Sequence, residues 1–428
     1  MTNLDVVTGP VSRDPKLHRN PGSPTKENDV NEELLDIAKR RLYPNYKQAP
    51  FIPTRGEGCV LFDGTGHKWL DLCAGVAVST VGHAHPKLIA AIEEQAGRVI
   101  HLSNYFYNEP NIRLADELCK RTGFSRAFFC NSGTEANEAL LKLARHHFWA
   151  KGDKKRSRMI AFDSAFHGRT MGALSLTGTS KYREGFGDFS GVTHVPYGDL
   201  EAVQTAIGDD VCAIIAEPVL GEGGVVVAPP GFLAGLRKIA DRAGALLFID
   251  EIQTGVGRTG KFFAHEGDVK PDAVSMAKAL GGGVPIGAML TTEELAGALP
   301  PGTHGSTFGG NALACAAALA VLEILDEEKL VEGAKTKGEA LGRMLEGVVR
   351  ELPDVCEGQR GAGLLRGLVL KKGLVARDIL PKLFDAGVLL IAAGENVLRF
   401  APPLIITEDE LATGVKIVRS VLSELKSA

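Results

Sequence analysis

The stretch ALLFIDEIQTGVGRTG, residues 245–260, decides the fold class of this chain. Five apolar residues come first, and from Asp250 onward the sequence becomes acidic, polar and rich in glycine. An unbroken apolar run of this length is typical of a strand that is buried on both faces of a parallel sheet. The segment therefore predicts a central strand with a polar loop at its carboxyl end.

Four further segments repeat this pattern of a short apolar strand that ends in polar or glycine residues. Helical patterns lie between several of them, which suits the crossover connections of a parallel sheet. We therefore predict an α/β fold with a largely parallel sheet, whose polar strand ends gather at one edge as a ligand site. The four segments are RAFFC before NSGTEANE, RMIAF before DSAFHGRT, VCAIIA before EPVLGEGG, and DAVSM before AKALGGG.

The character of the sequence changes on either side of this α/β region. Residues 1–30 are polar, carry both signs of charge and lack the apolar core of a signal peptide, so we expect a disordered tail. Residues 31–85 begin with an amphipathic helix from Asn31 and a hairpin around an Asp-Gly-Thr-Gly turn. We assign residues 86–325 to a large α/β domain and residues 326–428 to a smaller α+β domain, which the 31–85 segment helps to complete.

Composition excludes several classes of protein. The chain of 428 residues has 48 basic and 52 acidic residues, so its net charge of −4 provides no field to attract nucleic acid. No apolar run approaches the roughly 18 residues of a membrane helix. The seven cysteines include no C-x-x-C pair, which argues against a disulfide framework or a zinc site and favours a reducing compartment. We expect a cytoplasmic protein with no nucleic acid, membrane or metal partner.

Three features at the strand ends bear on chemistry. Ser132, Gly133 and Thr134 lie where a strand gives way to a helix, a place that holds phosphate, although a simple helix N-cap uses the same residue types. Asp250 ends a buried strand, where a carboxylate needs a cation or a donor, and a structural salt bridge would also satisfy it. Lys278 stands alone among small apolar residues, which favours a lowered pKa unless its side chain extends to solvent.

Together these features match the needs of pyridoxal phosphate. That cofactor requires a phosphate cradle, a lysine amine that binds it covalently, and a carboxylate that keeps its pyridine nitrogen protonated. A nicotinamide dehydrogenase would instead need a glycine fingerprint after the first strand, and the sequence has none. The three features in combination predict a pyridoxal-phosphate enzyme more specifically than any one of them does.

From residue 35 to residue 425 the chain resembles a fold-type I, class III (omega) aminotransferase, and within that family it is most similar to the acetylornithine aminotransferases. The resemblance implies a large, mainly parallel-sheet α/β domain with a smaller α+β domain. The motifs that carry it are, in chain order, PFIPTRGEG, GHAHP, SNYFYNEP, NSGTEANE, FHGRTMGALS, FIDEIQTGVGRTG, AKALGGGVPIGAM, HGSTFGGNALACAAA and RFAPPL.

The resemblance also implies which residues contact pyridoxal phosphate. Lys278 is implied as the Schiff-base lysine, Asp250 as the partner of the pyridine nitrogen, and Gln253 as a neighbour of the ring oxygen. The other residues implied to bind the cofactor are Ser132, Gly133 and Thr134 at the phosphate, Phe166 against the ring, and Glu217.

Substrate and partner contacts follow from the same resemblance. Arg169 corresponds to the family arginine that binds a substrate carboxylate, and a planar guanidinium suits that task. Arg399 corresponds to a second arginine, which pairs with Glu222 until the second carboxylate of 2-oxoglutarate competes for it. In relatives the Ser-Thr pair found here at Ser306 and Thr307 reaches the phosphate across a dimer interface, so a homodimer with shared active sites is implied.

The implied reaction transfers the terminal amino group of N2-acetyl-L-ornithine to 2-oxoglutarate, in arginine biosynthesis. Succinylornithine, N-succinyl-diaminopimelate, ornithine and 4-aminobutyrate stay open as alternative donors, because no motif reports on the acyl end of the substrate. A catalytically silent binding protein of this fold is a further alternative, although every residue with an implied chemical role is present. One departure is Leu220, at a position of the EPVLGE motif where relatives often have glutamine.

Overall fold

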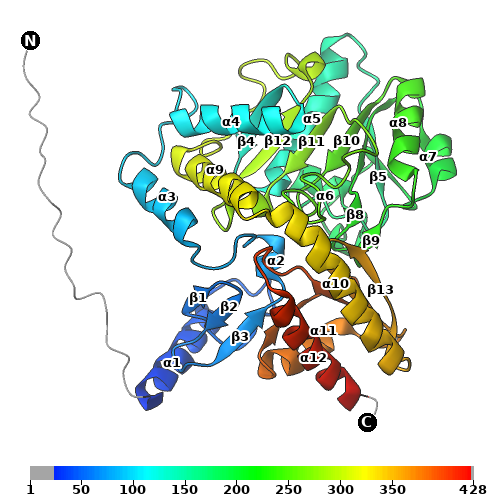
Figure 1. Cartoon of the computed structure of the whole chain (residues 1–428). Helices are drawn as coiled ribbons and strands as arrows, with labels where there is room; N and C mark the ends of the chain where they lie inside the picture. The colour runs from blue at the N-terminus through cyan, green and yellow to red at the C-terminus, as the bar shows by residue number, and fades with distance from the viewer. Residues whose placement is uncertain (1–23, 426–428) are drawn as a thin grey trace, which may run out of the picture. The chain divides into compact units, whose positions relative to one another are not determined.

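The computed structural model describes residues 24–425 (Figure 1). The chain divides into two compact units, one within Met1–Arg55 and Phe62–Lys68, the other within Gly56–Leu61 and Trp69–Ala428. The disordered tail expected for residues 1–30 lies, up to residue 23, outside the described residues. Every candidate site residue belongs to the second unit.

The first unit contains helix α1 (Pro24–Arg41) and a tight turn. The helix begins at Pro24 rather than at Asn31, and proline suits a first turn because its missing N–H would have no intrahelical acceptor. The turn is the one predicted around Asp-Gly-Thr-Gly, between β2 (Val60–Phe62) and β3 (Lys68–Asp71). The carboxylate of Asp63 accepts hydrogen bonds there from the backbone N–H groups of Thr65 and His67, both at 2.9 Å.

A seven-stranded sheet, in the order β4-β12-β11-β10-β7-β5-β6, forms the centre of the second unit. Neighbouring strands pair in parallel except for β12, which is antiparallel to both β4 and β11. The prediction of a largely parallel sheet is thus confirmed, and its five expected strands are β4, β5, β7, β10 and β11. The bounds are β4 (Arg126–Cys130), β5 (Arg158–Phe162), β6 (Val192–Val195), β7 (Val211–Ala216), β10 (Leu246–Asp250), β11 (Ala273–Met276) and β12 (Gly287–Thr291).

Helices cover both faces of this sheet, as its apolar strands require. Side chains along a strand alternate between the two faces. Leu247 and Ile249 of β10 pack in the same core cluster as α8 (Phe232–Ala243), whereas Phe248 between them packs with α5 (Gly133–Ala150) in another cluster. Strands β6 (VTHV) and β12 (GAMLT) were not predicted because polar residues or glycine interrupt their apolar runs.

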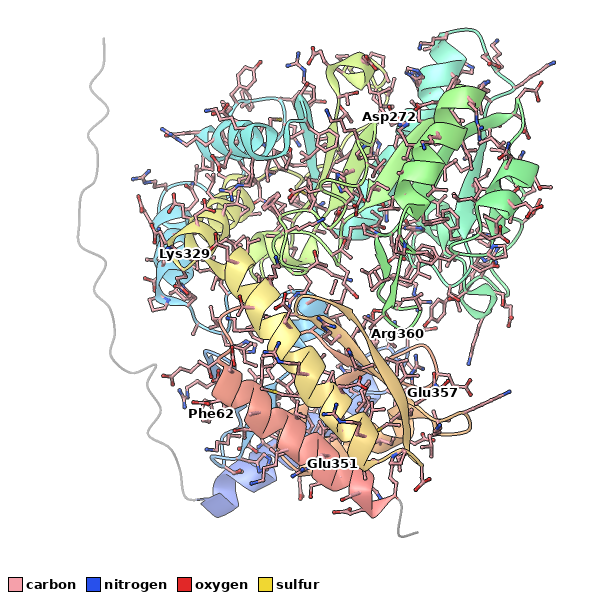
Figure 2. The ribbon with its side chains drawn as sticks, turned by 45° about the vertical axis from the view of Figure 1, so that its right-hand side comes forward. Phe62, Asp272, Lys329, Glu351, Glu357 and Arg360 are labelled. Atoms are coloured by element: carbon pink, nitrogen blue, oxygen red, sulfur yellow. The ribbon has the colours of Figure 1, made fainter. Side chains whose placement is uncertain are left out.

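A four-stranded antiparallel sheet, in the order β13-β14-β17-β16, follows in the C-terminal part of the chain. Its strands are β13 (Cys356–Ala362), β14 (Leu365–Leu370), β16 (Ile391–Ala393) and β17 (Val397–Phe400). Arg419 of α12 (Glu408–Glu424) pairs at 2.9 Å with Glu351, the last residue of α10 (Leu330–Glu351), and so joins two of the accompanying helices (Figure 2).

The remaining helices and strands are short or connect these two sheets. They are α2 (Ala74–Ala77), α3 (Pro86–Ala96), α4 (Glu109–Thr122), α6 (Met171–Leu176), α7 (Leu200–Ala206), α9 (Ala312–Glu327), α11 (Ala376–Asp385), β1 (Arg55–Glu57), β8 (Val219–Leu220), β9 (Val226–Val227) and β15 (Val388–Leu389). Between residues 24 and 425, no helix has both the length and the apolar composition that crossing a membrane requires.

Candidate active site

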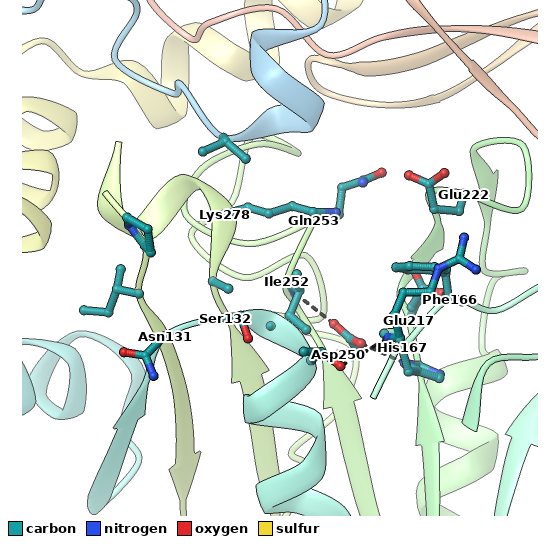
Figure 3. A pocket seen from close by; sticks show the side chains of 18 of the residues that line it. Asn131, Ser132, Phe166, His167, Glu217, Glu222, Asp250, Ile252, Gln253 and Lys278 are labelled. Atoms are coloured by element: carbon teal, nitrogen blue, oxygen red, sulfur yellow. Dashed lines mark hydrogen bonds and ion pairs between the residues drawn. The ribbon is translucent and has the colours of Figure 1, made fainter. Parts of the chain in front are cut away.

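The carboxyl ends of β4, β5, β7, β10 and β11 meet at one cavity of about 400 Å³ (Figure 3). Sequence-distant residues share it because parallel strands all end at the same edge of a sheet. In the described part of the chain, no three His, Cys, Asp or Glu side chains are arranged to hold a metal ion. The predicted site residues that line the cavity are Ser132, Gly133, Thr134, Phe166, Arg169, Glu217, Glu222, Asp250, Gln253 and Lys278.

Lys278 extends into this cavity from a strained turn. It follows β11 and opens a short 3-10 helix (Lys278–Gly281) with φ of 40°, a value that L-residues rarely adopt. Its amine has no hydrogen bond or ion pair with any described residue, and apolar side chains such as Val284 and Ile286 surround the same space. Burial lowers the pKa of the amine, although the charge of Glu222 acts in the opposite direction. A larger neutral fraction makes the amine a usable nucleophile and base.

Asp250 places a fixed negative charge on the opposite side of the cavity. Its Oδ2 accepts hydrogen bonds from His167 Nδ1 at 2.7 Å and from Asn137 Nδ2 at 2.8 Å, and its Oδ1 accepts from the backbone N–H of Ile252 at 2.9 Å. Burial lowers the pKa of His167, but the hydrogen bond and charge of Asp250 outweigh burial and raise it. A histidine that holds its proton places a positive charge next to the Asp250 carboxylate.

The N-terminus of α5 forms the third side of the cavity. Ser132 is the N-cap, and its Oγ accepts a hydrogen bond from the backbone N–H of Glu135 at 3.4 Å. A Cβ at Gly133 would lie 2.7 Å from the Ile252 side chain, so any larger residue there requires Ile252 to shift. Thr134 Oγ1 accepts a hydrogen bond from the backbone N–H of Arg169 at 3.2 Å, which joins two cavity loops. Ser132 therefore acts as the helix N-cap that the sequence allowed. The first turn of α5 also presents the positive end of the helix dipole to the cavity.

Arg399 and Glu222 form an ion pair at the edge of the cavity. Arg399 Nη1 lies 2.6 Å from Glu222 Oε1 and also donates to Gln253 Oε1 at 3.1 Å. Burial raises the pKa of Glu222, but Arg399 outweighs it, so the pKa is lowered. The Nε of Arg399 is buried with no partner among the described residues, which leaves donor capacity for another acceptor.

Backbone contacts hold the loop that carries Glu222. The N–H of Gly394, just before β17, donates to the carbonyl of Glu222 at 2.8 Å. Arg360 of β13, labelled in Figure 2, donates to the carbonyl of Gly224 at 2.8 Å. The C-terminal sheet thus positions both members of the Arg399–Glu222 pair.

Arg169 is exposed and stacks on aromatic rings. Its guanidinium carbon lies 3.9 Å from the ring centre of Tyr182 and 5.4 Å from that of Phe166. Across residues 24–425, no carboxylate pairs with it in the structure. Stacking fixes the orientation of a guanidinium and leaves its N–H groups free for a carboxylate ligand.

Glu217 is buried beside the loop that carries Phe166. Its Oε1 accepts a hydrogen bond from the backbone N–H of Phe166 at 2.9 Å, and burial raises the pKa of Glu217 to about 7. Leu220, the departure from the family motif, packs in the apolar core and does not line the cavity.

Ser306 and Thr307 do not line the cavity of this chain. Ser306 Oγ accepts hydrogen bonds from Asn131 Nδ2 at 3.1 Å and from the backbone N–H of Gly309 at 3.0 Å. Asn104 Nδ2 donates to the carbonyl of Ser306 at 2.8 Å. The exposed aromatic side chains along these two segments are Tyr105, Phe106, Tyr107 and Phe308.

Several cavity or support residues escaped the sequence analysis, among them Val78, Asn137, Tyr182 and Ile252. Asn137 had the clearest signal, since it lies one helical turn after Gly133, on the face of α5 that packs against the sheet. A polar side chain at such a position needs a partner. Its Nδ2 also donates to the carbonyl of His167 at 2.7 Å, so it joins two strand ends.

Comparisons with known proteins agree with this geometry. Residues 42–422 match the family model described as Aminotransferase class-III. The chain is 48% identical to an acetylornithine aminotransferase of Myxococcus xanthus, over 91% of this chain and 98% of that protein. It is 45% identical to a succinylornithine transaminase/acetylornithine aminotransferase of Pseudomonas aeruginosa, over 90% and 96% of the two chains. The crystal structure of ornithine aminotransferase from Toxoplasma gondii superposes with a TM-score of 0.89 at 31% identity, covering 94% and 98%.

Proposed function

Because this chain belongs to the class III aminotransferase family, we propose that it transfers the terminal amino group of N2-acetyl-L-ornithine to 2-oxoglutarate with pyridoxal 5'-phosphate as cofactor. The products are N-acetyl-L-glutamate 5-semialdehyde and L-glutamate, which places the reaction in arginine biosynthesis. The observation that carries the proposal is one cavity in which the unpaired amine of Lys278 and the buried carboxylate of Asp250 lie beside a helix N-terminus.

The residues present fit pyridoxal phosphate. The first turn of α5 at Gly133 and Thr134 would hold the phosphate, and Asp250 would hold the pyridine N–H. Lys278 would bind the aldehyde, and the side chains of Phe166 and Ile252 would lie against the ring. When bound, the cofactor supplies an electron-withdrawing ring next to the reacting carbon.

Lys278 and Asp250 would divide the proton chemistry between them. A desolvated amine with a lowered pKa can take a proton from the substrate carbon near neutral pH and return it in a later step. Asp250 accepts hydrogen bonds on its Oδ2 from both His167 and Asn137, which fix the orientation of its carboxylate. Its charge then stabilises a proton on the ring nitrogen.

The two arginines would let one cavity accept two different substrates. Arg169, which no described carboxylate engages, would bind the carboxylate common to both substrates. While Glu222 pairs with Arg399, the cavity has no free cation at that edge for a second carboxylate. With 2-oxoglutarate, its second carboxylate would displace Glu222, which is 26% exposed and able to move.

Succinylornithine is the second candidate donor. The name of the Pseudomonas aeruginosa relative, which is 45% identical to this chain, includes both activities. Ornithine itself is a third candidate, given the likeness to the Toxoplasma gondii structure.

The same proposal includes a homodimer in the cytoplasm, with Ser306 and Thr307 completing the active site of the partner. The exposed aromatic side chains of Tyr105, Tyr107 and Phe308 support it, since such patches on a protein surface mark interfaces. The seven free cysteines fit a reducing compartment.

A donor panel tests the proposed function. Wild type and Lys278→Ala are each assayed for glutamate formation from 2-oxoglutarate with acetylornithine, succinylornithine, ornithine and 4-aminobutyrate. We expect acetylornithine to give the highest kcat/KM and the variant to be inactive with every donor. A different preferred donor would overturn the substrate assignment, and an active Lys278→Ala would overturn the mechanism.

A further inference from the structure

The four residues of α2, Ala74–Ala77, form a turn of left-handed backbone. Their φ angles are 46°, 60°, 69° and 62°. L-residues other than glycine are strained in this region, and a β-branched residue such as Val76 suits it least. A run of four left-handed residues that includes only one glycine, Gly75, needs support from the surrounding structure.

Asp71 provides that support from the N-terminal side of the turn. Its Oδ1 accepts hydrogen bonds from the backbone N–H groups of Cys73 at 2.9 Å and Ala74 at 2.7 Å, and its Oδ2 lies 2.8 Å from Nε2 of His83. The carboxylate is 1% exposed. Burial raises the pKa of Asp71, but the hydrogen bond with His83 outweighs it, so the group stays ionised.

The segment that follows Arg399 fixes both ends of the turn. The N–H of Ala401 donates to the carbonyl of Leu72 at 2.8 Å, and the N–H of Leu404 donates to the carbonyl of Thr80 at 2.7 Å. Ala77 packs with Val397 and Ala401 in a small apolar cluster. The turn is therefore tied to the strand that carries Arg399.

The C-terminal end of the turn meets the active-site cavity. Val78 follows Ala77 directly and lines the same cavity as Lys278 and Glu222. In Figure 3 the blue ribbon of this segment lies above Lys278, on the side away from Asp250. Strained backbone that the surroundings hold in place clusters at functional sites, and this turn forms part of a cavity wall.

We infer that the left-handed turn Ala74–Ala77, held by Asp71 and His83, is a specificity-determining element that sets the position of Val78 against the amino donor. This inference rests on the proposed function and deepens it, because it assigns a wall of the donor site. Asp71 is a positioning residue that acts through the turn. A turn relaxed toward right-handed backbone would shift Val78 and loosen the fit of the donor.

Gly75→Ala and Gly123→Ala form a matched pair that tests this. Gly75 has φ of 60° and Gly123, the C-cap of α4, has φ of 75°, so a methyl group strains both positions. A Cβ at Gly75 would approach no atom closer than 3.9 Å, and one at Gly123 would have nothing within 4 Å. The two changes therefore add similar strain, one beside the cavity and one outside its lining.

Both holoenzyme variants should lose melting temperature to a similar extent and keep their cofactor. Only Gly75→Ala should raise KM for the amino donor, by about fivefold or more, with kcat changed less than about twofold. Equal KM values in the two variants, with normal wild-type turnover, would overturn this inference alone. A wild type that fails to transaminate any donor would overturn the proposed function and this inference with it.

Asp71→Ala and Asp71→Asn give a second test. The asparagine keeps one oxygen that can accept from both N–H groups of the turn, whereas alanine keeps none. We expect KM for the donor to rise in the order wild type, Asp71→Asn, Asp71→Ala. A wild-type KM in Asp71→Ala, or the reverse order, would show that the carboxylate does not act through the turn.

Discussion

Nδ1 of His167 lies 2.7 Å from Oδ2 of Asp250 although the two residues are 83 positions apart in the chain. His167 follows β5 and Asp250 is the last residue of β10, and β7 separates these two strands in the sheet. Their contact is buried and fixes the position of the Asp250 carboxylate at one side of the cavity, opposite the amine of Lys278 (Figure 3).

Asn137→Ala should weaken the site without removing any group that contacts the substrate. The change deletes the donor to Asp250 Oδ2 and to the carbonyl of His167, and a buried acceptor that loses its partner costs about 1–3 kcal/mol. We expect a lower free energy of unfolding, measured in urea, and a kcat reduced about tenfold. An unchanged kcat in folded Asn137→Ala would contradict a role for Asn137 in positioning Asp250.

Arg399→Lys should affect the two half-reactions differently. Lysine can keep a charge near Glu222 but cannot form the bidentate contact of a guanidinium with a carboxylate. We expect KM for 2-oxoglutarate to rise by about 10–100-fold and KM for acetylornithine by much less. Arg419→Ala, which breaks the surface pair with Glu351, is the control. Equal effects on both substrates would count against the assignment of Arg399.

Glu222→Gln should have the opposite effect on substrate choice. The neutral amide no longer neutralises Arg399, so a second carboxylate meets a free cation. Donors with two carboxylates should then gain kcat/KM relative to acetylornithine, by about tenfold. The measurement is a competition between acetylornithine and glutamate as donors. An unchanged ratio would mean that the pair does not control access to Arg399.

The free energy of unfolding should decrease as pH rises, because the pKa of Glu217 is raised in the folded protein. Its pKa is raised to about 7 in the fold from 4.5, so its stabilising contribution is fully present below pH 4.5 and is lost as pH rises through about 7. The loss is on the order of 3 kcal/mol, at about 1.4 kcal/mol per pKa unit. Glu217→Gln should flatten the dependence of the unfolding free energy on pH between about 4.5 and 7. A slope equal to that of wild type would assign the pH dependence to other groups.

Lys278→Met should abolish activity and stabilise the cofactor-free protein. The fold disfavours the charged amine, because burial lowers its pKa, and an apolar side chain of similar length removes that cost. We expect the unfolding free energy to rise by about 1–2 kcal/mol. Lys238→Met, at an exposed lysine of α8, should change it by less than about 0.5 kcal/mol. A destabilised Lys278→Met would mean that the amine has a structural partner.

Much of this fold could be predicted because the strands are buried on both faces. Continuous apolar runs such as VCAIIA and ALLFI are typical of central strands, and the polar residues after them mark the carboxyl ends of these strands. Strand β12 was missed because Gly287 interrupts its apolar run, and its antiparallel pairing with β4 and β11 depends on contacts that no local pattern encodes. The start of α1 at Pro24 was missed because the residues before Asn31 are polar and give no apolar stripe.

Some residues of the candidate site could be predicted from the sequence, and others could be identified only from their contacts in the folded chain. A lysine among apolar residues or a carboxylate at a strand end is visible locally, because the cost of burying a charge makes it exceptional. Asn137 and Tyr182 were missed because their importance lies in contacts with Asp250 and Arg169 from other segments. The left-handed turn Ala74–Ala77 was also missed, since nothing in the letters AGVA suggests backbone strain.

By itself, the sequence determined the α/β class, the strands that meet at the site and the chemical groups they carry. These follow from hydrophobic periodicity and from the cost of burying charge, both of which act within a short stretch of chain. Only the tertiary structure decided which groups pair: Asp250 with His167 and Asn137, and Arg399 with Glu222 and Gln253. Pairing depends on distances of a few ångströms between segments, and packing of the whole chain sets those distances.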